Sequence, residues 1–202
     1  MLDIAQLKLF AGILAVLFAF VSYLPYLQGM FAKTIQPHPY TWLIWTITTG
    51  TAALGVWHGG GGYGAFPLLL WTLLTCMIFF LSLKYGTKNI TTSDIALLFL
   101  ALVAILLWWQ FHAPLLSILM ITGIDALGYL PTFRKSFAEP WSESILSWAL
   151  FTLTAFFGLL ALTTYNFLTA IYLTMSASAN VIVIAICLAR RKSIPKPSAV
   201  HF

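Results

Sequence analysis

Leu97-Leu98-Phe99-Leu100-Ala101-Leu102-Val103-Ala104-Ile105-Leu106-Leu107-Trp108-Trp109 is an unbroken run of hydrophobic residues. A strand of a transmembrane barrel would alternate apolar and polar residues, and this run does not. It therefore predicts a helix with apolar surroundings on every side. The whole chain has the same character: 61% of its 202 residues are hydrophobic and only 7% are charged, against about 25% in a typical soluble domain. The sequence predicts an all-α integral membrane protein.

Polar, proline and glycine clusters divide the chain into apolar segments of the length that spans a bilayer, about 20 residues. The segments cover residues 7–29, 40–58, 65–85, 93–110, 113–131, 142–163 and 166–189. We expect seven transmembrane helices, joined by short connections. Among these connections, we expect Gly59 to Gly62 to be a flexible turn and Phe133 to Pro140 to be a loop.

Basic residues gather on one side of this arrangement. The first, third and fifth connections and the tail hold all but one of them: Lys33, Lys84, Lys88, Arg134, Lys135, Arg190, Arg191, Lys192 and Lys196. Only Lys8 falls on the opposite side. Because cytoplasmic loops carry an excess of Lys and Arg, we expect the N-terminus outside and the C-terminus in the cytoplasm. This multi-pass topology fits a bacterial inner (plasma) membrane.

The chain also contains an internal repeat. Tyr23-Leu24-Pro25 recurs as Tyr129-Leu130-Pro131, and the stretch from Trp45 to Gly55 matches that from Trp148 to Gly158. Residues 1–90 and 113–202 are therefore expected to be two copies of a three-helix unit, the second with a short basic tail, and residues 91–112 a connecting helix. Four helices separate the copies, so both have the same orientation. This 3+1+3 arrangement is a parallel repeat.

Such a layout, with a proline near the cytoplasmic end of the first and fifth helices, resembles the PQ-loop superfamily. That group includes the SWEET sugar carriers, the PnuC-type vitamin transporters and the KDEL receptors. The Pro-Gln dipeptide of the family is here Pro25-Tyr26 and Pro131-Thr132. The resemblance implies that Pro25 and Pro131 are hinges of a cytoplasmic gate, although prolines also occur in membrane helices for static reasons.

Asp125 is the one acidic residue expected deep within a span. Intramembrane acids tend to face a cavity, which favours a role in proton coupling or substrate binding. A protonated side chain bonded to a neighbouring helix, or one that extends to the membrane surface, are the alternatives. The position that corresponds to it in the first repeat is Ala19, so any site built on this acid is asymmetric.

Three further residues are candidates for a substrate site. Asn180 lies in a stretch of small and polar residues on the last helix, where the SWEET carriers have an asparagine in their substrate site; a helix interface would explain that stretch equally well. Its counterpart on the third helix is expected to be Met77. Trp45 and Trp148 occupy matching places and would give aromatic walls. Tryptophans also form interfacial belts, to which we assign Trp42, Trp57, Trp108, Trp109 and Trp141.

We therefore expect a small-solute transporter that works by alternating access, and no enzyme. Its substrate would be a sugar, a nucleoside-like vitamin or an amino acid, with proton coupling through Asp125 as an option. The alternative is a ligand- or peptide-binding membrane receptor of the KDEL-receptor type; a membrane subunit without a pocket is a third reading.

Several classes of partner are not expected. His58 and His112 lack a third ligand, so no metal site is expected, and the last helix has no lysine to hold retinal. No other cofactor is indicated. The net charge of +5 lies in the loops and does not indicate nucleic acid. The expected partners are a small-molecule substrate and the lipid bilayer, and no oligomeric state is specified.

Overall fold

The computed structural model describes residues 3–32, 37, 39–86, 92–138 and 140–195. These residues form helices and connections, with no strand among them. The α-helices are α1 (Ile4–Phe31), α2 (Pro39–His58), α3 (Phe66–Tyr85), α4 (Thr92–Phe111), α5 (Pro114–Ala138), α6 (Ile145–Leu160) and α7 (Phe167–Arg191). Two short 3₁₀ helices, η1 (Gly62–Ala65) and η2 (Pro140–Ser142), precede α3 and α6. The helical class of the fold is confirmed.

Local sequence signals explain where several of these helices begin. Asp3 and Asn166 each form a capping box with the third residue of α1 and α7, and the Ser144 side chain caps α6. Such caps satisfy backbone N–H groups that have no partner within the helix. Pro67 stands in the first turn of α3, where a proline costs no hydrogen bond.

The end of α5 differs from the expectation. Residues 133–138 continue the helix instead of forming a loop, so α5 extends seven residues beyond Pro131. Apart from the proline, the residues of this stretch carry no helix breaker, and Arg, Lys and Ala favour helix. Pro131, like Pro25 in α1, therefore lies inside a helix. A proline there removes one backbone hydrogen bond and weakens the helix locally.

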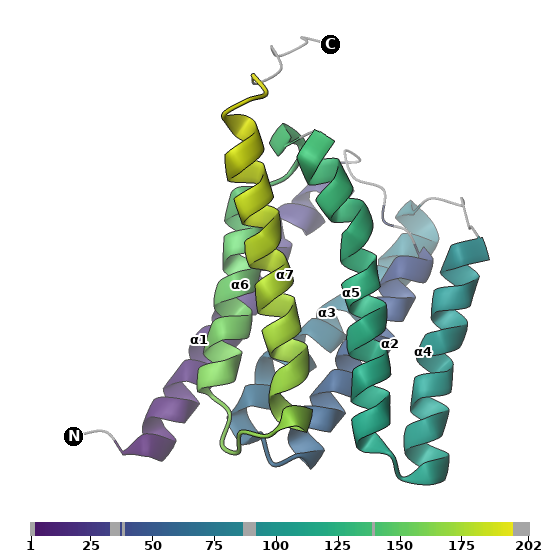
Figure 1. The fold of residues 1–202 in the computed structure, drawn as a ribbon, viewed down its shortest axis with the longest axis vertical. Helices are drawn as coiled ribbons and strands as arrows, with labels where there is room; N and C mark the ends of the chain where they lie inside the picture. Colours follow the sequence, from purple (N-terminus) through teal and green to yellow (C-terminus); the bar gives the residue numbers. More distant parts are fainter. Residues whose placement is uncertain (1–2, 33–36, 38, 87–91, 139, 196–202) are drawn as a thin grey trace.

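The helices pack in a pattern that is the same at both ends of the chain. In the N-terminal half (α1–α3), α3 packs against α1 and α2; in the C-terminal half (α5–α7), α7 packs against α5 and α6. Between the halves, α1 packs against α6 and α2 against α5. Exchanging the two halves leaves this list of neighbours unchanged. Helix α4 packs at the side, against α2 and α5 (Figure 1).

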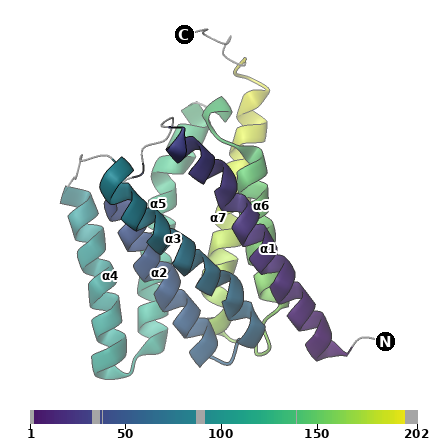
Figure 2. The same ribbon diagram turned by 180° about the vertical axis from the view of Figure 1, so that it is seen from behind.

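The direction of the helices decides which connections meet. Helix α1 begins at the end of the bundle where α2 leads into α3 and α6 into α7, and α7 finishes at the opposite end (Figures 1 and 2). We call these the α1-start end and the α7-finish end. Lys8 lies near the α1-start end, whereas Arg190 and Arg191 lie at the α7-finish end.

Small residues fill the contacts between helices, and large apolar residues face outward. Ala15, Ala19, Ala52 and Ala155 are fully buried, and buried threonines bond to carbonyls of their own helix. The exposed set includes many large side chains: Phe10, Leu54, Leu73, Phe80, Leu83, Phe99, Trp109 and Leu146. This distribution is typical of helices packed within lipid, where close backbone contact stabilises association.

Within the described part of the chain, three helical segments are long and apolar enough to cross a membrane by length and composition: Ile4–Phe31, Gly62–Tyr85 and Phe167–Arg191. Three shorter apolar segments accompany them: Leu98–Phe111, Pro114–Tyr129 and Ile145–Leu160. The chain has the helices of a membrane protein.

Candidate functional site

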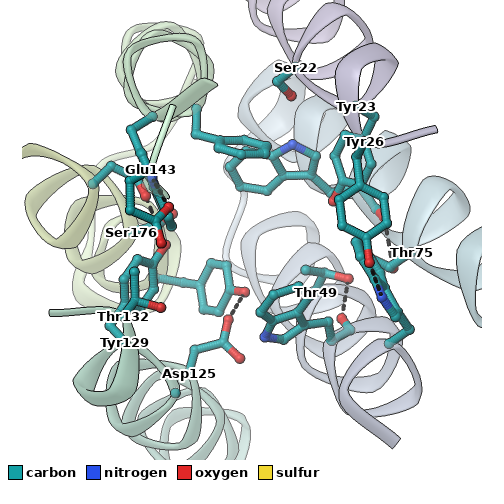
Figure 3. Close-up of a pocket in the computed structure, with 18 residues that line it drawn as sticks. Ser22, Tyr23, Tyr26, Thr49, Thr75, Asp125, Tyr129, Thr132, Glu143 and Ser176 are labelled. Carbon is teal, nitrogen blue, oxygen red and sulfur yellow. Dashed lines mark hydrogen bonds between the residues drawn. The ribbon is translucent and has the colours of Figure 1, made fainter. Parts of the chain in front are cut away.

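A cavity of about 340 Å³ lies between the two halves (Figure 3). Every helix of both halves contributes side chains to it, and α4 contributes none that the structure describes. Its lining residues are Ser22, Tyr23, Tyr26, Trp42, Trp45, Thr49, Trp71, Thr75, Asp125, Gly128, Tyr129, Thr132, Glu143, Trp148, Phe151, Tyr172, Ser176 and Asn180. This volume is within the range of small-molecule sites, roughly 300–1,000 Å³.

All four residues predicted for the site line this cavity: Asp125, Asn180, Trp45 and Trp148. The repeated tripeptide also contributes to it. Tyr23 and Tyr129, the first residues of its two copies, face the cavity from opposite sides (Figure 3). Pro25 is exposed and does not belong to the lining, and the role of Pro25 and Pro131 as hinges stays a prediction.

Asp125 stands on α5, and its carboxyl group extends toward the neighbouring helices (Figure 3). The Tyr172 hydroxyl on α7 donates a hydrogen bond to Oδ2. The other oxygen, Oδ1, is buried and has no hydrogen-bond partner among the residues described. One half of the carboxyl group is therefore held by the protein and the other half is unsatisfied.

Asn180 on α7 is 1% exposed and is held by a hydrogen bond from α5. Its Oδ1 accepts a hydrogen bond of 2.9 Å from the Tyr129 hydroxyl, whereas its Nδ2 has no partner within the described part of the chain. Tyr172, Ser176 and Asn180 are four residues apart in succession, a spacing that puts them on one face of α7. That face forms the wall of the cavity.

Position 77 does not play the matching role on α3. Met77 is 39% exposed on the outside of the bundle and is absent from the lining, which takes Trp71 and Thr75 from α3.

Aromatic rings form much of the remaining wall. On the N-terminal side Trp42 lies 4.9 Å from the ring of Tyr26 and 5.1 Å from that of Trp45, and its Nε1 donates to the Tyr26 hydroxyl. Trp42 is 5% exposed, so its assignment to an interfacial belt is wrong. Trp57 and Trp109, at 60% and 74% exposure, are on the outside.

The C-terminal side has a comparable aromatic group. Trp148 lies 6.0 Å from both Tyr129 and Phe151, and its Nε1 donates a hydrogen bond of 2.9 Å to Glu143 Oε2. Glu143 precedes α6 and is the second acidic residue of the lining. Its backbone carbonyl accepts a hydrogen bond of 2.7 Å from Arg191, which ties this connection to the end of α7.

At the α1-start end, the two halves are joined by hydrogen bonds to backbone carbonyls. The Thr163 amide donates to the Gly61 carbonyl at 2.9 Å, and the Asn166 Nδ2 donates to the Gly59 carbonyl at 2.9 Å. Lys8 Nζ donates to the Thr163 carbonyl at 3.1 Å. We call this set of contacts the glycine latch. It joins the two halves at the α1-start end.

The glycines in and beside the latch allow this close approach. Gly62 has a φ of +56°, and a Cβ built there would lie 2.5 Å from Thr163 Oγ1. A Cβ at Gly64 would lie 2.4 Å from Leu162 Cδ2. The segment forms the expected turn, and its glycines are needed there because another connection packs against them.

Several residues of the site were not predicted, namely Tyr23, Trp71, Tyr129, Glu143 and Tyr172. Aromatic residues in apolar runs are usually packed against core or lipid, so their types alone do not mark a cavity. A signal was present for two of them, since the repeat itself begins with a tyrosine in each copy.

No metal centre is formed by the described residues, which contain no cluster of three or more His, Cys, Asp or Glu side chains. His58 and His112 lie at the α1-start end, away from the cavity.

Comparison with protein-family models, curated proteins and solved structures gave no match for the chain. The cavity and the glycine latch are therefore the features of the chain that bear on its function.

Proposed function

We propose that the chain is a small-solute membrane carrier that alternates access to the cavity by rocking its two halves. The observation that carries this proposal is the position of the cavity, which lies between two halves of like packing that the glycine latch joins at the α1-start end. Carriers built from repeats hold their substrate at such an interface and open it to either side in turn.

The proposal includes the membrane topology. All seven helices cross the bilayer, α1–α3 and α5–α7 form a parallel repeat, and α4 connects them. The α7-finish end, with Arg190 and Arg191 in the last turn of α7, faces the cytoplasm by the positive-inside rule. Lys33, Lys88 and Lys196 lie outside the described residues. The glycine latch then stands at the outer surface, and the protein is a multi-pass protein of a bacterial inner membrane.

The similarity of packing in the two halves supports a relationship to the PQ-loop superfamily as part of the same proposal. Pro25 and Pro131 lie inside α1 and α5 and interrupt the hydrogen-bond ladder of each helix. We propose that the two helices bend at these points when the cytoplasmic end closes.

The test uses an engineered cross-link that holds the latch shut. A Cβ on Gly12 would lie 3.7 Å from Cβ of Ala161, and disulfides join Cβ atoms about 3.8 Å apart. The pair Gly12→Cys and Ala161→Cys is introduced after replacement of the native Cys76 and Cys187 by Ala. Oxidation then links α1 to the residue that follows α6, next to the latch.

The readout is the accessibility of the cavity from each side, which requires no knowledge of the substrate. Thr49→Cys adds a thiol to the cavity wall, and a membrane-impermeant maleimide is applied to right-side-out and inside-out vesicles. A carrier gives labelling from both sides before oxidation and from the cytoplasmic side alone after it, with reduction restoring both. Labelling from one side only, unchanged by oxidation, would instead favour a receptor.

A matched control excludes an effect of oxidation itself. The variant with Thr49→Cys and Gly12→Cys but with Ala161 retained cannot form the cross-link, so oxidation should leave its labelling pattern unchanged. Loss of labelling in this control would mean that the cavity thiol is oxidised directly.

A further inference from the structure

Three residues of the cavity lining each carry a buried polar atom without a hydrogen-bond partner among the described residues. Among the buried side-chain nitrogen and oxygen atoms without a hydrogen-bond partner in the described chain are Asp125 Oδ1, Asn180 Nδ2 and Trp71 Nε1. All three residues line the cavity, from α5, α7 and α3. Buried polar groups in folded proteins nearly always have a partner, and leaving one without costs free energy. These atoms indicate a ligand that supplies one donor and at least one acceptor.

The charges of the lining are of one sign. Asp125 and Glu143 both line the cavity, and no Lys, Arg or His belongs to the lining as the structure describes it. A carboxylate that leaves water is stable only when it is paired. The Tyr172 hydroxyl supplies one hydrogen bond to Asp125 but no positive charge. A cationic ligand would supply the missing charge.

The walls suit such a ligand. Trp42, Trp45 and Trp148 line the cavity together with several tyrosines. The face of an aromatic ring attracts a cation, and indole attracts it most strongly. The same rings give flat apolar area for the uncharged part of an organic molecule.

We infer that the cavity binds an organic ammonium ion with an aromatic or apolar body, whose N–H groups bond to Asp125 and whose acceptor group meets Asn180 and Trp71. This inference names the substrate class of the proposed carrier and rests on that proposal only for the step of transport. It puts an amine without a carboxylate in place of the sugar, vitamin or amino acid expected from the sequence. A quaternary ammonium ion fits less well, because it has no N–H to offer Oδ1.

Binding to the purified full-length chain in detergent tests the inference. Three probes differ in one group: tyramine carries an ammonium, tyrosol carries a neutral hydroxyl in its place, and tyrosine carries an additional carboxylate. Calorimetric titration and the shift of the unfolding temperature measure their affinities. We expect tyramine to bind at least about tenfold more tightly than tyrosol or tyrosine, a difference of ~1.4 kcal/mol.

Two matched variants locate the charge that is recognised. Asp125→Asn should weaken tyramine binding about tenfold or more and leave tyrosol binding within about twofold. Asp3→Asn makes the same chemical change at the cap of α1, outside the cavity, and asparagine caps as well as aspartate. It should keep the preference for tyramine.

Either of two results would overturn the inference: equal binding of tyramine and tyrosol, or a preference for tyramine that survives in Asp125→Asn. Absence of binding by tyramine, tryptamine and phenethylamine at millimolar concentration would overturn it as well. If Asp125→Asn does not fold, the comparison of the three probes on the unaltered chain still decides. Amine binding with a cavity labelled from one side only would retain the ligand class and reject the carrier.

Discussion

The Tyr129 hydroxyl donates to Asn180 Oδ1 at 2.9 Å and so joins α5 to α7 at the cavity wall. The same two helices are joined a second time, by the bond from Tyr172 to Asp125. In the N-terminal half the bond from Trp42 to Tyr26 joins α2 to α1. Each side of the cavity is thus braced across helices by its own polar residues.

Removal of the Tyr129 hydroxyl should destabilise the chain. Tyr129→Phe leaves the 1%-exposed Asn180 without its partner, which should lower the free energy of unfolding by ~1–3 kcal/mol. Thermal unfolding in detergent measures the change. The control is Tyr23→Phe, which removes the corresponding hydroxyl of the N-terminal half. This hydroxyl has no hydrogen bond to another described residue, so the loss should be smaller. Equal losses would contradict the bracing role of Tyr129.

The bond between Tyr172 and Asp125 should appear as a coupling between the two residues. Tyr172→Phe and Asp125→Asn each remove part of one hydrogen-bonded pair, so their effects on the free energy of unfolding should differ from additivity by about 0.5–3 kcal/mol. A double-mutant cycle by chemical denaturation measures this term. The pair Tyr129→Phe and Asp125→Asn, which are not bonded to each other, serves for comparison. Additive effects in the first cycle would show that the bond contributes nothing.

Substitution of Gly62, which lies beside the latch, should weaken the contacts at the α1-start end. Gly62→Ala forces a side chain into a left-handed conformation, which costs roughly 1–2 kcal/mol, and pushes it against Thr163. The unfolding temperature should fall, and outside labelling of Thr49→Cys should rise. Gly123→Ala is the matched control, because a Cβ there meets nothing within 4 Å. Its stability should stay equal or rise by about 0.4–1 kcal/mol.

Arg191 should be irreplaceable by lysine. Its guanidinium donates to the carbonyls of Pro140 and Glu143, at 3.1 and 2.7 Å, and lies 4.5 Å from the centre of the Trp141 ring. Lysine keeps the charge but lacks the planar fork that makes both bonds. Arg191→Lys should lower the free energy of unfolding by ~1–3 kcal/mol, measured by denaturation. The exposed neighbour Lys192 is the control, and Lys192→Arg should have little effect.

The elements of the fold could be predicted because each depends on a local pattern. Long apolar runs bounded by polar clusters gave the seven helices, since such runs are stable only where lipid or protein surrounds them. The end of α5 was missed because the polar and basic stretch from Phe133 to Pro140 was expected to be a loop. Inside an apolar environment neighbouring helices can compensate for the hydrogen bond that a proline removes, so the helix continues to Ala138.

The site could be predicted only at residues whose polar or acidic side chains are rare in membrane helices. An acid such as Asp125 and an amide such as Asn180 are costly in lipid, which marks them in the sequence. Tyr172 and Trp71 could not be recognised, since whether their side chains face the cavity depends on the rotation of each helix about its axis. The role of the glycine latch was hidden for the same reason: Gly61 meets a partner, Thr163, that lies 102 positions away in the chain.

The three unsatisfied atoms of the cavity have a stereochemical consequence. Asp125, Asn180 and Trp71 stand on three different helices and differ in kind, one accepting and two donating. A chiral ligand would meet the cavity at three unlike points: its ammonium group, its acceptor and its apolar body. Only one of its two mirror forms can make all three contacts. The cavity should therefore distinguish the mirror images of a chiral amine, even though its two halves are built on nearly the same plan.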